Sequence, residues 1–257
     1  MSTDIRRNPS PEERELEKKK TELASLEADL IQRELDLATL RAELAEFEAG
    51  YLRSVGVLYA ELDEIEAQIA EAQARSRPND HEAQEKAGHA RARAKESEQT
   101  AAPIAEAKIK PTERLKTLYR QVAKRIHPDL ANSDVDRARR QRLMAEVNLA
   151  YENGDEAKLR AILADWHDSP DTVEGEGVAS DLIRMIRKIA QIEKRLNEID
   201  SETRQLMASD LYLLRTQIVN LGKQGRDGFK DMAATAEKQI IEARCRLSAL
   251  TKSAENT

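Results

Sequence analysis

Residues 115–129 read LKTLYRQVAKRIHPD, and this stretch decides how the middle of the chain folds. Its apolar residues recur every three or four positions and so share one helical face: Leu115, Leu118, Tyr119, Val122 and Ile126. Its basic residues line the opposite side: Lys116, Arg120, Lys124 and Arg125. Proline lacks a backbone N–H and disfavours helix at the residue before it. The helix is therefore predicted to end near Ile126, with His127 and Asp129 held out on an exposed turn.

A second helical pattern follows at residues 136–151, DRARRQRLMAEVNLAY. Its apolar face consists of Leu143, Val147, Ala150 and Tyr151. Two short helices joined by a loop can bury such faces against each other, so the sequence predicts an antiparallel hairpin. Residues 153–155, Asn-Gly-Asp, are stop and restart signals, and a further short helix is expected over 156–166.

The order and spacing of these residues resemble the J-domain of the DnaJ family of co-chaperones. The resemblance runs from Thr112 to about Asn153, and it includes the His-Pro-Asp tripeptide and a Val-Asn-x-Ala-Tyr segment at 147–151. It implies a surface that binds a DnaK-type (70-kDa heat-shock) chaperone and stimulates ATP hydrolysis by that partner. The residues it implies for this contact are His127, Pro128, Asp129, Lys116, Tyr119, Arg120, Lys124 and Arg125.

The chain also departs from the family pattern. The upstream stretch AAPIAEAKIKPTE lacks the aromatic first helix that usually covers such a hairpin, and a neighbouring coiled-coil segment is expected to cover it instead. The tripeptide is followed by Leu130, where a basic residue is common. No Gly/Phe-rich linker or CxxC repeat follows, so a general substrate-holding chaperone is not indicated.

Heptad patterns flank this module on both sides. Residues 11–75 carry apolar positions in alternating steps of three and four, which predicts a coiled coil. Two adjacent steps of four, from Phe47 to Tyr51 and from Tyr51 to Val55, form a stutter, and Gly50 and Gly56 mark the expected bend there. A second coiled coil is predicted over 179–251, where Gly222, Gly225 and Gly228 indicate a hairpin turn or a weak point.

The predicted fold class is therefore all-α, with long coiled-coil helices flanking a small J-domain-like hairpin. The domain organisation that we predict is a disordered start at 1–10, coiled coil 11–75, a flexible or partly helical linker 76–110, J-like module 111–166, linker 167–178, coiled coil 179–251 and tail 252–257. The two rods could pair with a second copy of the chain, giving a homodimer, or antiparallel within one chain.

Composition narrows the function classes. Among 257 residues, 35% are charged and only 3% aromatic, which is typical of long helices. The net charge of −6 argues against nucleic acid as a partner, because nucleic acid is itself negatively charged. A single cysteine, Cys245, and the lack of any apolar run of about 20 residues predict a cytoplasmic protein that does not span a membrane. No catalytic, metal-binding or cofactor-binding pattern is found, so the chain is not predicted to be an enzyme.

Two functional hypotheses follow. The first is a J-domain co-chaperone for a DnaK-type partner, with coiled coils that recruit an unidentified client or mediate self-assembly. The alternative is a structural coiled-coil scaffold with a non-stimulating J-like hairpin, which the missing first helix and Leu130 favour. A third and weaker reading, association with nucleic acid, is opposed by the net charge.

Overall fold

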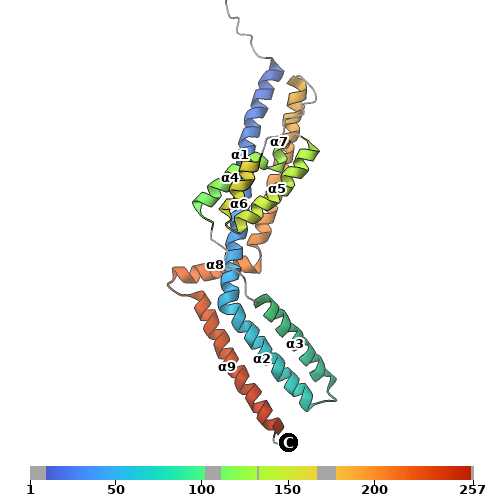
Figure 1. The fold of residues 1–257 in the computed structure, drawn as a ribbon, viewed down its shortest axis with the longest axis vertical. Coiled ribbons are helices and arrows are strands. Elements are labelled where there is room, and N and C mark those ends of the chain that lie inside the picture. Colours follow the sequence, from blue (N-terminus) through green and yellow to red (C-terminus); the bar gives the residue numbers. More distant parts are fainter. Residues whose placement is uncertain (1–9, 102–110, 132, 167–177, 256–257) are drawn as a thin grey trace, which may run out of the picture. The chain divides into compact units, whose positions relative to one another are not determined.

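The computed structural model describes residues 10–101, 111–131, 133–166 and 178–255, and in these ranges the regular structure is helical. The prediction of an all-α fold is confirmed. The chain divides into unit 1, Met1–Glu43 and Lys108–Ser209, and unit 2, Leu44–Ala107 and Asp210–Thr257. Figure 1 shows the helices of both units, and each unit is described below by itself.

Unit 1 contains the predicted hairpin. Helix α4 (Glu113–Ile126) ends where the proline rule predicts, and a 3-10 turn, η2 (Pro128–Leu130), leads toward α5 (Asp134–Glu152) and α6 (Glu156–Asp165). The Tyr119 hydroxyl donates to Asn148 Oδ1 at 2.8 Å, and the rings of Tyr119 and Tyr151 pack edge to face. Arg140 of α5 donates to the Arg125 carbonyl of α4 at 2.8 Å. Since residue numbers rise along α4 as they fall along α5, the hairpin is antiparallel, as predicted.

Helix α1 (Pro11–Tyr51) packs against the hairpin. It contributes Ile31, Leu35, Ala38 and Ala42 to a single core with α4, α5 and α6. The Tyr151 hydroxyl also lies 2.8 Å from the Thr39 Oγ1 of α1. The expectation that a neighbouring coiled-coil segment covers the hairpin is therefore confirmed.

A second face of α1 packs against α7 (Val178–Met207). The buried residues of this second core are Leu23, Leu30, Leu37, Ile189, Ile192 and Ile199. Ion pairs join Arg33 to Asp200 and Arg41 to Glu202. Because the numbers rise together on both helices, α1 and α7 run parallel within one chain. Antiparallel pairing in cis, one of the two alternatives offered by the sequence, is therefore wrong for this pair of segments. Pairing with a second copy of the chain stays a prediction.

Unit 2 begins with the last turns of α1, a π-helical turn η1 (Leu52–Gly56) and α2 (Val57–Ser76). A π-helical turn accommodates an extra residue within a helix. It lies at the predicted stutter, so the position of the irregularity was correctly read from the sequence. Helix α2 packs against α9 (Gly228–Glu255) through a core that includes Leu62, Ile65 and Ile240.

Helix α3 (His81–Ala101) occupies most of the segment that we predicted to be a flexible or partly helical linker, so the helical alternative holds for these residues. Residues 102–110 of the linker lie outside the described part of the chain. Helix α3 packs closely on α2 through small side chains, with Ala87 and Ala94 buried. Arg91 pairs with Glu64 at 2.5 Å and with Glu71 at 2.7 Å across this interface. Small residues let two helix backbones approach closely, so this helix packs without the large apolar residues that predictions depend on.

The second predicted coiled coil is divided into three helices. A break after Met207 separates α7 from α8 (Asp210–Lys223), and a turn separates α8 from α9. Gly225 in this turn has φ of +77°, a conformation that L-residues with a side chain rarely adopt. The glycine triplet is therefore a turn, one of the two alternatives that the sequence left open. The predicted disordered start at 1–9, most of the second linker at 167–177 and the last two residues of the tail lie outside the described residues.

Candidate functional site

The His-Pro-Asp tripeptide lies at the corner between α4 and η2, in unit 1. His127 follows the last residue of α4, and its backbone N–H still donates to the Ala123 carbonyl at 3.0 Å. Its Nδ1 accepts a hydrogen bond from the Asp129 N–H at 3.2 Å, which closes a short turn over the proline. The tripeptide thus forms a compact turn with its own internal hydrogen bonds.

This turn is not exposed, and the prediction that His127 is held out toward solvent is wrong. The His127 side chain is 1% exposed, and that of Asp129 is 20% exposed. Leu130, at the end of the turn, packs against the core formed by α1 and α7. The physical reason is that the parallel pair α1–α7 lies directly on the loop, which a reading of the hairpin alone does not predict.

Glu34 of α1 is the group that meets His127. Its Oε1 lies 3.4 Å from His127 Nε2, and both side chains are buried. Because His127 Nδ1 accepts the Asp129 N–H, the proton of a neutral imidazole belongs on Nε2, and Nε2 donates to Glu34. Glu34 lies between Leu30, which faces α7, and Leu35, which faces the hairpin, and so it reaches both neighbours.

Arg195 of α7 completes the contact from the other side. Its Nε donates to the same Glu34 Oε1 at 2.7 Å, and its Nη1 donates to Glu202 at 2.9 Å. Arg41 of α1 also donates to Glu202, at 2.5 Å. The result is an ion-pair network that starts at the loop histidine and links α1 to α7, which we call the Glu34–Arg195 network.

The pKa values of Glu34, which meets the loop from α1, and of Asp129, in the loop itself, are shifted in opposite directions. Burial by itself raises the pKa of Glu34, but the hydrogen bonds from His127 and Arg195 outweigh it, so the pKa of Glu34 lies below its usual value of 4.5. Burial raises the pKa of Asp129 above 3.8, although His127 and Arg137 oppose that shift. The network therefore favours a charged Glu34, whereas the site of Asp129 disfavours its charge.

The remaining residues of the predicted partner-binding surface divide into three groups. Lys124 and Arg125, in the last turn of α4, are exposed. Lys116 and Arg120 are partly buried. Lys116 pairs with Glu113 at 2.8 Å, and Arg120 donates to Gln32 of α1 at 3.2 Å. Tyr119 is fully buried, and it belongs to the hairpin core rather than to a surface. Pro128 is partly buried.

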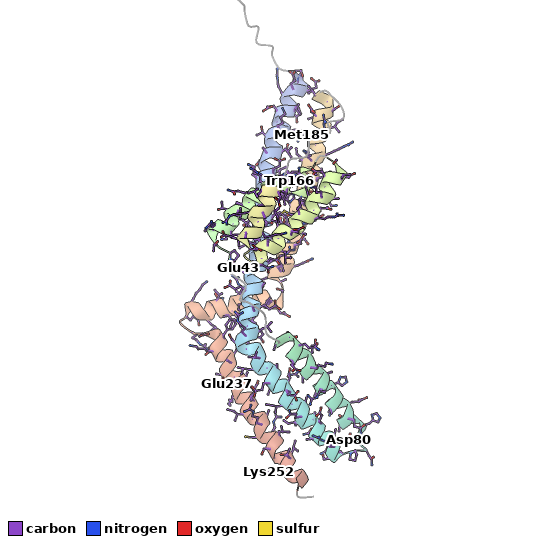
Figure 2. The ribbon with its side chains drawn as sticks, viewed as in Figure 1. Glu43, Asp80, Trp166, Met185, Glu237 and Lys252 are labelled. Atoms are coloured by element: carbon purple, nitrogen blue, oxygen red, sulfur yellow. The ribbon has the colours of Figure 1, made fainter. Side chains whose placement is uncertain are left out.

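A second cationic cluster lies near the exposed end of α4. The guanidinium groups of Arg139 and Arg140 stack on the ring of Trp166, at 4.7 and 5.0 Å from its centroid. Trp166, labelled in Figure 2, follows α6 and is buried in the hairpin core. A cation over an indole face is an attractive contact, so this cluster helps to hold α5 against the end of α6.

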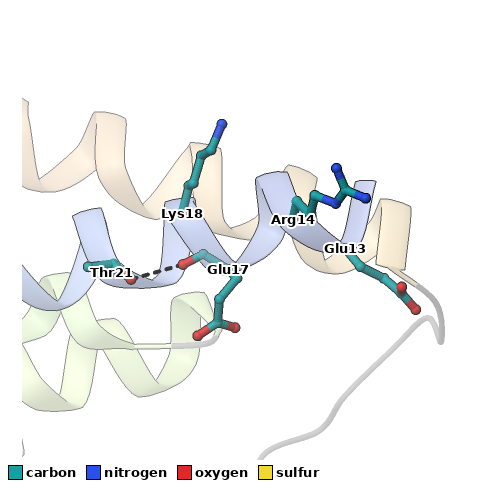
Figure 3. A pocket seen from close by; sticks show the side chains of 5 residues that line it. All are labelled: Glu13, Arg14, Glu17, Lys18 and Thr21. Atoms are coloured by element: carbon teal, nitrogen blue, oxygen red, sulfur yellow. Dashed lines mark hydrogen bonds between the residues drawn. The ribbon is translucent and has the colours of Figure 1, made fainter. Parts of the chain in front are cut away.

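The pocket drawn in Figure 3 is unrelated to this loop. It is lined by Glu13, Arg14, Glu17, Lys18 and Thr21, all from the first turns of α1, and the Thr21 hydroxyl donates to the Glu17 carbonyl. Since groups from a single helix do not converge on a bound molecule, it does not suggest an active site. Within the described ranges, no cluster of three or more His, Cys, Asp or Glu side chains is arranged for a metal. A search of the same ranges found no helix whose length and hydropathy suit a membrane span.

The sequence reading missed Glu34 and Arg195. A signal for Glu34 exists in the heptad pattern, because it lies four residues after Leu30 and three before Leu37 and so places a charge next to a buried seam. Arg195 lies next to Leu196 and three residues after Ile192 in the same way. Neither pattern indicates that Glu34 and Arg195 pair with each other, since the two residues are 161 positions apart in the sequence.

The opposite pKa shifts give a pH-dependent prediction. Wild-type protein should be more stable than the Glu34→Gln variant at pH 7, by about 1.5–3 kcal/mol, because hydrogen bonds to a charged group are lost. A carboxyl whose pKa is lowered on folding contributes stability above its unfolded pKa and loses it as the pH falls through the folded value. The advantage of wild type should therefore shrink below about pH 4.5, measured by urea unfolding at a series of pH values.

The Asp129→Asn variant is the matched control for this measurement. Since burial raises the pKa of Asp129, its charge costs folding free energy near neutral pH, and the variant should be the more stable protein there. That difference should also shrink on acidification. Equal and parallel pH profiles for wild type and both variants would contradict the assignment of these shifts.

Comparisons with protein-family models, with curated proteins and with solved structures each found no match to this chain.

Proposed function

We propose that this chain is a co-chaperone of the J-domain type, which binds a DnaK-type chaperone through the α4–α5 corner and stimulates its ATP hydrolysis. The observation that carries the proposal is the antiparallel hairpin with the His-Pro-Asp tripeptide at its turn and with exposed Lys124 and Arg125 beside it. The Tyr119–Asn148 hydrogen bond fixes the two helices, because it joins the centre of α4 to the Val-Asn-x-Ala-Tyr segment of α5. The chain itself contributes no catalytic group in this proposal, and a cytoplasmic location goes with it.

The parts outside the hairpin would then serve recruitment. Unit 2 presents apolar side chains that are about half exposed, among them Leu213 and Ile241. Exposed apolar residues that gather on helices are typical of surfaces that contact other proteins. A client protein or a second copy of the chain are the two occupants that fit the proposal.

One observation favours the second candidate function, a structural scaffold. His127 is buried against Glu34, so in this conformation it cannot touch another protein. In a scaffold, the tripeptide would serve only to pack the hairpin against α1 and α7. The two functions differ in whether the loop ever becomes accessible to a partner.

Single-turnover ATP hydrolysis by the DnaK-type chaperone of the source organism tests the proposal. Wild-type protein should accelerate hydrolysis, and His127→Gln should abolish the acceleration, since the tripeptide makes the stimulating contact. His81→Gln is the control, because His81 is an exposed histidine at the start of α3 and belongs to unit 2. Circular dichroism should show the same helix content for all three proteins.

Two outcomes would contradict the proposal. In the first, neither wild type nor a variant with an opened loop stimulates hydrolysis at any concentration, which leaves the scaffold. In the second, His127→Gln stimulates as well as wild type, which means that the tripeptide is not the contact.

A further inference from the structure

The His-Pro-Asp loop is covered by an element that the hairpin does not need for its own core. The core of the hairpin is built from α1, α4, α5 and α6, and no residue of α7 belongs to it. Helix α7 contacts the loop instead, where Leu130 packs against the leucines and isoleucines of the α1–α7 core. Removing α7 would therefore uncover the side of the loop that carries Leu130 and would release Glu34 from Arg195, while the hairpin core stays complete.

The polar contacts point to the same element. Arg195 is the residue of α7 that binds Glu34, and Glu34 in turn accepts from His127. A second polar contact lies nearby, where Arg137 of α5 donates to Gln191 of α7 at 2.8 Å. Helix α7 is thus fastened to the loop region by side-chain contacts at Gln191 and Arg195, one turn apart.

From this arrangement we infer that α7 is a reversible latch, held by the Glu34–Arg195 network, which closes the partner-binding loop in the resting protein. The inference rests on the proposed function, because a latch matters only if the loop has a partner. In the closed state, α7 covers Leu130, and its Arg195 binds the Glu34 that meets His127. In the open state, α7 and Arg195 have left the loop while α1 still covers the hairpin.

A latch of this kind sets the apparent affinity for the partner. When only a fraction of molecules is open, the apparent affinity is the affinity of the open form multiplied by that fraction. Any change that weakens α7 docking must then raise loop accessibility and partner stimulation by the same factor. This equality is what distinguishes a latch from a general loss of stability.

Wild-type protein supplies the first test, by native-state hydrogen exchange with increasing urea. The loop reporters are the backbone amides of Asp129, Leu130 and Ala131, which donate within the loop at 3.1–3.2 Å. They should exchange through the same opening as the amides around Ile192 of α7, at a lower free energy than those of Tyr119 and Val147 in the hairpin. Loop amides that exchange only when the hairpin unfolds would overturn the latch.

Variants supply the second test. Arg195→Gln removes the charge that fastens α7, and Arg187→Gln is the control, because Arg187 is an exposed arginine on the same helix. Arg195→Gln should raise both loop exchange and subsaturating stimulation of ATP hydrolysis by one common factor, roughly 5–150-fold. Arg187→Gln should change neither. If Arg195→Gln also unfolds the hairpin, the double variant Glu34→Gln/Arg195→Gln replaces it, since it leaves no buried unpaired charge.

The possible failures are separable. Faster loop exchange without increased stimulation, in a protein whose wild type does stimulate, overturns the latch and leaves the co-chaperone proposal standing. Faster loop exchange with no stimulation by wild type or by any variant overturns the co-chaperone proposal. Adding His127→Gln to Arg195→Gln should keep the fast exchange and abolish the stimulation.

Discussion

Replacing Arg195 with glutamine is expected to lower the free energy of unfolding of unit 1 by about 3 kcal/mol. The reason is that Glu34, only 5% exposed, is left with a buried charge and with His127 as its remaining partner in the network. Breaking a buried ion pair by removing one partner typically costs about 3–5 kcal/mol. The lower end applies here, because the Arg195 side chain itself is 26% exposed.

Urea unfolding followed by circular dichroism measures this effect. Arg187→Gln on the same helix should change the free energy of unfolding by no more than about 0.5 kcal/mol, as is usual for exposed positions. The double variant Glu34→Gln/Arg195→Gln should recover part of the loss, since no unpaired charge remains. A double variant whose loss of unfolding free energy equals or exceeds the sum of the two single losses would show that the pair is not coupled as described.

Leu35→Ala and Leu37→Ala should each destabilise unit 1 by about 2–5 kcal/mol, but they should loosen different parts of it. Both leucines are 1% exposed, and they lie two residues apart on α1. Leu35 belongs to the core with the hairpin, whereas Leu37 belongs to the core with α7. The pair therefore offers two substitutions of the same chemistry on opposite sides of one helix.

Hydrogen exchange distinguishes the two variants. Leu35→Ala should speed the exchange of amides in α4 and α5, including those of Val122 and Val147, because it removes the cover of the hairpin. Leu37→Ala should speed exchange around Ile192 and in the His-Pro-Asp loop, and it should leave the hairpin amides nearly as slow as in wild type. The same exchange pattern in both variants would mean that α1 joins one undivided core rather than two.

Local structure in this chain could be read from the sequence wherever a local rule governs it. The end of α4 before Pro128, the restart at Asp155 and the irregular turn at Leu52–Gly56 each follow from backbone chemistry or from the spacing of a few neighbouring residues. The antiparallel α4–α5 hairpin was also predictable, since a short loop and two apolar faces leave little choice. The packing of helix α3 on α2 was not predicted, because alanine packs closely but produces no strong apolar pattern.

The candidate site was predictable only in part. The resemblance to the J-domain family implied a contact at the tripeptide and at the exposed Lys124 and Arg125, but the burial of His127 was not predicted. Burial depends on what lies on the loop, and here that is a pair of helices from distant parts of the sequence. A histidine at a helix end looks the same in sequence whether solvent or another helix faces it.

The sequence by itself determined the helical segments, the corner between α4 and α5 and the presence of a leucine-rich seam on α1. Only the tertiary structure decided that α7 fills this seam in a parallel orientation and thereby covers the loop. The physical reason is that apolar contact has no direction: Leu30 and Leu37 can be buried by any helix that offers leucine and isoleucine at matching intervals. The choice of partner and direction depends on specific long-range contacts such as Glu34–Arg195. The sequence around either residue does not indicate which residue it will pair with in the folded chain.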